Sequence, residues 1–136
     1  MATGYLALIL HAHLPYVRHP EHPGFLEEIW LYEALTESYL PLIRVFEGLI
    51  RDGVPFRLSM SITPTLTQML SDQLLRTRYV SHLERMIELA EREIERTRWQ
   101  PEFNELARMY YELFSRARYT FVERYRYDIL QAFKRF

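Results

Sequence analysis

The sequence predicts an α/β protein in which two parallel strands are followed by long helices. An unbroken apolar run, Tyr5–Leu10, is typical of a strand covered on both faces, as in a parallel sheet flanked by helices. A second run, Phe56–Ile62, alternates between apolar and polar residues, which indicates a second strand. Elsewhere apolar residues recur every three or four positions, so strand and helix alternate as at the start of an α/β fold.

The composition is that of one ordinary globular domain. The chain has 136 residues, of which 49% are hydrophobic and 26% charged. Its formal net charge of −1 gives no reason to expect nucleic acid or an anionic membrane as a partner. Cysteine is absent, which excludes disulfides and thiol chemistry. The lack of a signal-peptide pattern and of a bilayer-spanning apolar stretch predicts a cytoplasmic protein.

A loop and then a helical region follow the first strand. The segment "PYVRHPEHPG" contains too many prolines for a helix or a central strand. From Phe25 to Ile50 apolar residues recur at helical spacing. Pro41 is expected to kink or divide this helix, because proline lacks the amide donor and clashes with the preceding turn. Gly53 supplies a helix stop.

The second strand is expected to lead directly into another helix. Thr63 is placed as an N-cap, with Pro64 at the first helical position. Residues 71–136 then form a mostly helical segment, in which one apolar stripe gives way to another near Pro101. The second stripe comprises Phe103, Leu106, Tyr110, Leu113, Phe114, Ala117, Phe121 and Tyr125. Arginines and aromatic residues mix towards the C-terminus, but their helical spacing favours a packed helix over an RNA-binding surface.

Two strands alone leave unpaired edges and uncovered apolar faces. Such features promote association, so we expect the isolated chain to self-associate. The final helical pattern, "DILQAFKRF", has no cap or trailing loop. The sequence is therefore expected to be the opening part of a larger protein.

A pair of histidines stands at the carboxyl end of the first strand. Successive side chains of a strand point to opposite faces, so His11 and His13 share one side and Ala12 faces the other. Sites in α/β barrels and open sheets are built at this end of the strands. The pair can bind a metal, contact a substrate, or only pack the strand end. A metal would need further ligands, and the spacing of His19, His22 and His82 identifies none of them as a ligand. His19 and His22 are expected to be solvated loop residues.

Three sequence blocks resemble the N-terminal part of glycoside hydrolase family 57, in particular its α-1,4-glucan branching enzymes. They are "HAHLPYVRHPE", "LYEALTESYLPLI" and "SITPTLTQML", in this order. The resemblance implies that residues 1–136 are the N-terminal fragment of an incomplete, seven-stranded (β/α) barrel. It also implies a retaining enzyme acting on α-1,4-glucans of the glycogen or amylose type, with no cofactor and no metal.

The resemblance further implies that the catalytic groups lie elsewhere. In the family a glutamate is the nucleophile and an aspartate the acid and base, both on later strands beyond residue 136. We therefore expect no catalytic residue in this chain and no activity from it alone. Glu27 and Glu28 are interpreted as first-turn charges that favour the helix dipole.

The residues expected to bind substrate are few. The resemblance assigns His11 and His13 to the sugar subsite beside the scissile bond. Trp30 and Tyr32 are candidates to stack on glucose faces, although helical aromatic residues more often belong to the core. Ser61 and Thr63 end the second strand on one face, so either is a candidate to reach the pocket, although an N-cap role alone is sufficient for Thr63.

Two other functions remain open from the sequence. One is a metal-dependent hydrolase whose first strand ends in H-x-H. The other is a non-catalytic helical interaction module whose strands pair with a partner.

Overall fold

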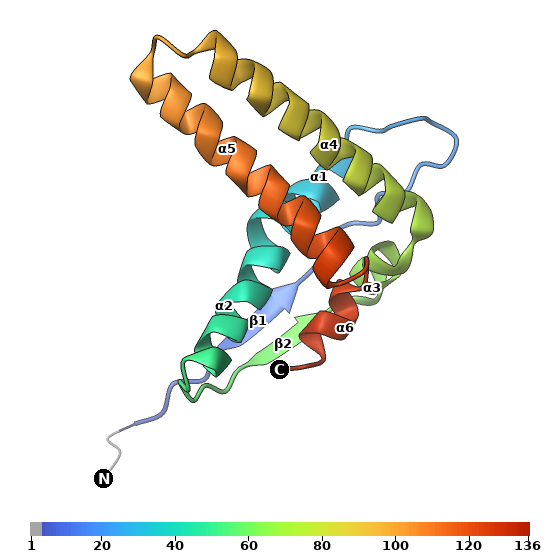
Figure 1. The fold of residues 1–136 in the computed structure, drawn as a ribbon. Coiled ribbons are helices and arrows are strands. Elements are labelled where there is room, and N and C mark those ends of the chain that lie inside the picture. The colour runs from blue at the N-terminus through green and yellow to red at the C-terminus, as the bar shows by residue number, and fades with distance from the viewer. Residues whose placement is uncertain (1–3) are drawn as a thin grey trace.

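The computed structural model describes residues 4–136, in which a small parallel sheet is covered by helices and a long helical hairpin projects from it (Figure 1). In chain order the elements are β1 (Ile9–Ala12), α1 (Glu28–Glu33), the π-helical segment η1 (Ala34–Tyr39), α2 (Leu40–Arg51), β2 (Ser59–Ile62), α3 (Pro64–Ser71), α4 (Gln73–Arg96), α5 (Pro101–Tyr119), a second π-helical segment η2 (Thr120–Arg124) and α6 (Ile129–Phe133). The predicted order of strand, helix, strand and long helices is confirmed.

The two strands pair in parallel, as predicted, with His11 opposite Ser61. Their bounds differ from the prediction: β1 begins at Ile9 and not at Tyr5 and continues to Ala12, and β2 begins at Ser59 and not at Phe56. The expected burial of the run Tyr5–Leu10 is also wrong for the described chain. Tyr5, Leu6 and Ile9 are 99%, 93% and 73% exposed. A strand is buried on both faces only when other layers lie over it, and residues 4–136 supply neither those layers nor further strands.

The first long helix carries the predicted break. Residues 34–39 form a wider π-helical turn between α1 and α2. The ring of Pro41 would crowd the carbonyl four residues earlier, and the wider turn relieves this clash. Helix α2 ends at Arg51, and the predicted stop, Gly53, follows two residues later with a φ of 69° in the left-handed region. The Val54 amide then donates to the Leu49 carbonyl at 2.9 Å, which satisfies the helix end.

The core lies where α1, η1 and α3 meet the near ends of α4 and α5. Its most buried side chains include Leu31, Leu66, Leu75, Tyr79 and Phe121, and the later part of the predicted stripe, from Ala117 to Tyr125, belongs to it. The earlier part does not. Phe103, Leu106 and Tyr110 are exposed near the far end of the hairpin, where no third element covers them within the described residues.

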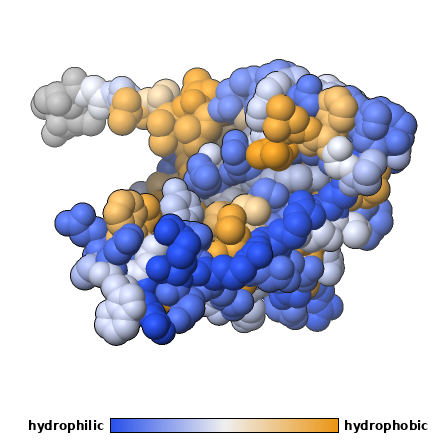
Figure 2. Space-filling view, turned by 90° about the horizontal axis from the view of Figure 1, so that it is seen from above, coloured by the Kyte–Doolittle hydropathy of each residue, from blue (hydrophilic) through white to orange (hydrophobic). Residues whose placement is uncertain are grey.

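Apolar side chains also reach the surface beside the N-terminal segment (Figure 2). They interrupt a face that is otherwise mostly hydrophilic. Among residues 4–136, no helix combines the length and apolarity needed to cross a bilayer.

Candidate functional site

Two imidazoles stand side by side at the carboxyl end of β1. His11 Nδ1 lies 2.6 Å from Ser61 Oγ, and His13 Nδ1 lies 3.3 Å from Thr63 Oγ1. The ring centroids are 6.0 Å apart and the ring planes differ by 11°. Ala12, on the other face, is buried. The structure thus brings together the four residues that were predicted at the ends of the two strands.

The hydroxyl of Thr63 does not act as a helix cap. Thr63 occupies the N-cap position of α3, with extended φ and ψ of −68° and 152°, but within the described chain its side chain makes no capping hydrogen bond. Its hydroxyl instead contacts His13 and, at 3.2 Å, Thr65 Oγ1. Thr65 in turn donates to the Leu14 carbonyl at 3.2 Å. The predicted position of Thr63 is confirmed, and the capping role expected for its side chain is wrong.

These hydroxyl contacts orient both rings. Each ring is bonded through Nδ1, and Nε2 of each ring has no hydrogen-bond partner among residues 4–136. When the hydroxyl donates to Nδ1, the proton of a neutral imidazole is on Nε2, which becomes a donor; when Nδ1–H donates to the hydroxyl, Nε2 is an acceptor. Because Thr65 donates its proton to the Leu14 carbonyl, Thr63 donates to Thr65 and accepts from His13 Nδ1, so Nε2 of His13 is an acceptor. The strand end therefore presents two nearly parallel rings with polar nitrogens available to a ligand. No three His, Cys, Asp or Glu side chains converge within the described residues, so a metal here would need ligands from elsewhere.

The two predicted stacking residues have different environments. Trp30 is 49% exposed on α1 and is accessible. Tyr32 is 4% exposed, and its hydroxyl donates to Glu28 at 2.9 Å. Burial and the Glu28 carboxylate raise the pKa of Tyr32 well above its usual value. Its ring packs against Tyr79 and His82, so the prediction that Tyr32 stacks on sugar is wrong for this structure.

Tyr16 is an accessible aromatic residue that the sequence prediction missed. It lies three residues after His13, is 45% exposed, and accepts a 3.4 Å hydrogen bond from Gln68 on α3. Its place in "HLPY" was the available signal, because an aromatic residue directly after a candidate site can supply a stacking surface.

The loop after the histidines is attached to α4 through Arg78, which forms a buried ion pair with Glu28. Arg78 binds the Glu28 carboxylate and the backbone carbonyls of His19 and His22. Glu28 is 1% exposed, so its main role is to pair with Arg78, beyond the dipole role expected for it. The His19 ring is half-buried against Phe25, whereas His22 is exposed as predicted.

A second ion pair fixes the same loop to the start of α4. Arg18 Nε lies 2.7 Å from Asp72 Oδ2, and Asp72 Oδ1 also caps α4 by accepting from the Leu75 amide at 3.0 Å. The loop that follows the histidines is thus held at several points.

The family model of glycosyl hydrolase family 57 matches residues 7–136. The chain belongs to this family. A 1,4-alpha-glucan branching enzyme of Thermococcus kodakarensis is 37% identical over 91 residues, which are 67% of this chain and 13% of that protein. A probable 1,4-alpha-glucan branching enzyme of Mycobacterium tuberculosis is 33% identical over 69 residues, or 51% of this chain and 13% of that protein.

Solved family 57 structures share the fold. The alpha-amylase AmyC of Thermotoga maritima superposes with a TM-score of 0.87 at 46% identity, over 95% of this chain and 24% of AmyC. The branching enzyme of Pyrococcus horikoshii gives a TM-score of 0.86 at 33% identity, over 97% of this chain and 24% of that one. This family 57 chain thus spans about a quarter of the length of these solved chains and about an eighth of the length of the curated relatives.

Proposed function

We propose that this chain is the N-terminal part of a retaining family 57 enzyme that branches α-1,4-glucans, and that His11 and His13 bind glucose hydroxyls beside the scissile bond. The observation that carries the proposal is the pair of parallel imidazoles, fixed by Ser61 and Thr63 at the carboxyl end of the strands. The branching enzymes among the relatives support the choice of reaction.

The geometry suits sugar recognition. Nδ1 of each ring is occupied by a hydroxyl, which turns Nε2 towards a ligand. A hydrogen bond that a sugar hydroxyl donates to an unprotonated Nε2 strengthens as positive charge develops on the sugar ring, because that hydroxyl becomes a better donor, and this stabilises the transition state. We propose that two accessible aromatic residues, Trp30 on α1 and Tyr16 after His13, stack on sugar.

The reacting carboxyls are proposed to come from outside this chain. A retaining mechanism needs two of them about 5–5.5 Å apart, one as nucleophile and one as acid and base. The buried carboxylate of the first helix, Glu28, is 1% exposed and paired with Arg78, which makes it unsuitable for either role. We therefore propose that the isolated chain forms neither α-1,6 branch points nor new reducing ends from amylose.

Hydrolysis is the second candidate reaction for the intact enzyme. The 46% identity to AmyC, whose name is that of an alpha-amylase, favours it. The two reactions differ in the group that accepts the glycosyl unit, which is a sugar hydroxyl in branching and water in hydrolysis.

A binding experiment tests the proposed role of the histidines. Titration calorimetry with maltotetraose should show saturable binding to the chain, and His11→Ala should weaken it about tenfold through loss of a hydrogen-bonding group. His22→Ala is the matched control, because His22 is exposed in the loop, nine residues after His13 in the sequence. Unchanged affinity in His11→Ala, with its fold intact by circular dichroism, would overturn the proposal.

Other properties complete the proposal. We place the chain in an incomplete, seven-stranded (β/α) barrel, with residues 71–136 as a mostly helical segment inside it, in a cytoplasmic protein without a cofactor. The metal-dependent alternative predicts that the chain binds stoichiometric zinc, which elemental analysis measures. The interaction-module alternative predicts one cooperative thermal transition for the isolated chain and no affinity for glucans.

A further inference from the structure

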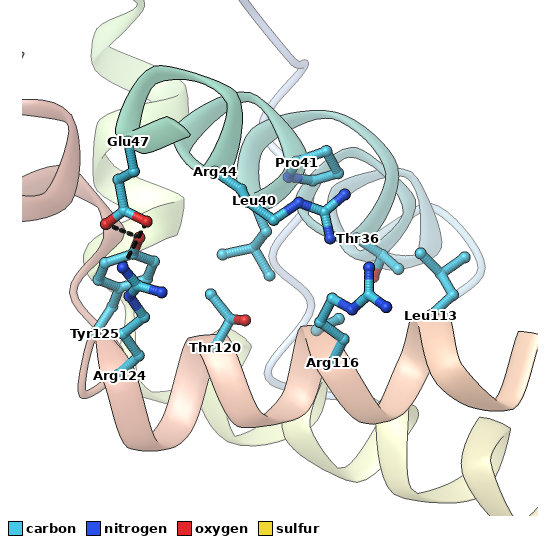
Figure 3. Close-up of a pocket in the computed structure, with 11 residues that line it drawn as sticks. Thr36, Leu40, Pro41, Arg44, Glu47, Leu113, Arg116, Thr120, Arg124 and Tyr125 are labelled. Atoms are coloured by element: carbon cyan, nitrogen blue, oxygen red, sulfur yellow. Dashed lines mark hydrogen bonds and ion pairs between the residues drawn. The ribbon is translucent and has the colours of Figure 1, made fainter. Parts of the chain in front are cut away.

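A small cleft separates the first long helix from the end of the hairpin (Figure 3). One wall is formed by η1 and α2, and the other by α5 and η2. Its volume is about 70 Å³, enough for a few water molecules and too little for a sugar chain or a nucleotide. None of the residues that line it comes from β1, β2 or the loop after the histidines.

The charges in the cleft are unbalanced. At one end Glu47 accepts a 2.7 Å hydrogen bond from Tyr125 and forms a 2.7 Å ion pair with Arg124. Arg44 and Arg116 line the same cleft, and among residues 4–136 neither has a carboxylate within 4.0 Å or a side-chain hydrogen bond. By contrast, Arg118 on the same helix pairs with Glu84 at 3.1 Å.

The two unpaired arginines face one space. They come from different helices and are 72 positions apart in the sequence, and Figure 3 shows both guanidinium groups directed between the two walls. The two positive charges in one cleft repel each other, and an anion bound between them would be attracted by both. Leu40 and Pro41 form an apolar part of the cleft wall, while both arginines are exposed and accessible to an anion from solvent.

We propose that this cleft binds a phosphate group, either as inorganic phosphate or as the phosphate of a small monoester. A guanidinium donates two parallel hydrogen bonds, and a tetrahedral phosphate has enough oxygens for two such groups on different sides. A carboxylate has only two oxygens, and the Glu47 carboxylate is already occupied by Arg124 and Tyr125. Thr120, which lines the cleft and has no side-chain hydrogen bond among the described residues, adds a hydroxyl donor.

The proposal predicts residue-specific protection from chemical modification. Phenylglyoxal modifies accessible arginines, and mass spectrometry gives the rate at each position. Inorganic phosphate should slow modification of Arg44 and Arg116 at least fivefold in a saturable manner, relative to chloride at the same ionic strength. Arg108 is exposed on the same helix as Arg116, and within residues 4–136 its side chain bonds only to Asn104, so its modification rate should change less than twofold. Glucose 1-phosphate, compared with glucose, distinguishes a monoester from the free ion.

Variants test whether the two arginines act together. In Arg116→Gln, phosphate should protect Arg44 less than twofold, and Arg44→Gln should abolish protection of Arg116 in the same way. Arg108→Gln removes the same charge from α5 and should leave protection of both unchanged. Equal protection by chloride, protection of Arg108 as strong as that of Arg44, or full protection of Arg44 in Arg116→Gln would overturn the proposal.

Discussion

Ser61 fixes the orientation of the His11 ring through the 2.6 Å contact between Oγ and Nδ1. The residues occupy matching positions on β1 and β2, so the parallel register itself creates the contact. A histidine held in this way loses little rotational freedom when it binds a ligand, which improves affinity. Ser61 is therefore a positioning residue for the proposed sugar site.

Replacing Ser61 tests this role. Ser61→Ala should weaken maltotetraose binding about threefold to tenfold, because His11 is then free to rotate and to change its tautomer. Ser59→Ala is the matched control, since Ser59 lies on the same exposed face of β2 and within the described chain has no side-chain hydrogen bond. Calorimetric titration measures both. Equal affinity in the two variants would remove Ser61 from the site.

His82 gives the fold a dependence on pH. Burial and then the nearby Arg85 lower the pKa of His82 below its ordinary value, while Glu33 opposes the shift. The unfolded chain therefore binds the proton more tightly than the folded chain does. The contribution of His82 to the free energy of unfolding should be complete above about pH 6.5, the ordinary histidine pKa. It should be lost as pH decreases through the lowered pKa.

The substitution His82→Gln should flatten this part of the pH dependence. Urea unfolding between pH 7 and pH 5 measures it, above the range in which most carboxylates titrate. An unchanged slope in His82→Gln would assign the dependence to other groups.

At the scale of elements, the Glu28–Arg78 pair joins α1, the proline-rich loop and α4. Glu28 is 1% exposed, and Arg78 also binds the carbonyls of His19 and His22. These residues are up to 59 positions apart, and nothing in their local sequence identifies the contact. The sequence-based view of Glu28 as a first-turn charge was incomplete for this reason.

Removing Arg78 should destabilise the fold. Arg78→Leu leaves a buried carboxylate without its partner, and we expect a loss of about 3–5 kcal/mol in the free energy of unfolding. Arg85→Leu, two helical turns later and exposed, should change it by less than about 0.5 kcal/mol. Urea denaturation of both variants measures the difference. Similar small losses in both would show that the pair does not anchor the loop.

Local periodicity explains which elements were predictable. Alternation along "FRLSMSI" correctly separated the partly buried Met60 and Ile62 from the exposed serines, and the same two-residue period placed His11 beside His13. Pro41 and Gly53 affect the helix at or near their own positions, Pro41 through the break and Gly53 through the helix end. These features depend on neighbouring residues only, so one sequence suffices to identify them.

At the scale of the whole molecule, burial was the feature that sequence patterns predicted least well. The run Tyr5–Leu10 and the hairpin residues Phe103 and Leu106 are apolar at suitable spacings and are nevertheless largely exposed. Tyr32, considered as a surface platform, is buried between α1 and α4. A pattern identifies the apolar side of an element but not whether another layer covers it.

The exposed apolar surface predicts association of the isolated chain. Tyr5 and Leu6 are almost fully exposed beside two strands that have no further neighbours within residues 4–136. Sedimentation velocity should show a larger mean sedimentation coefficient as protein concentration rises. The double variant Leu6→Lys with Leu8→Lys should reduce this dependence, because charges in the exposed segment directly before β1 oppose edge pairing. A concentration-independent monomer in the unaltered chain would contradict the prediction.

We propose above all that the His11 and His13 rings at the end of β1 contact a glucan. Intermolecular nuclear Overhauser effects between maltotetraose and the labelled chain test it most directly. We predict contacts from sugar ring protons to Hε1 of His11 and His13, and none to His22. Contacts only to a remote exposed aromatic residue such as Trp99, with none to either strand-end histidine, would contradict the account.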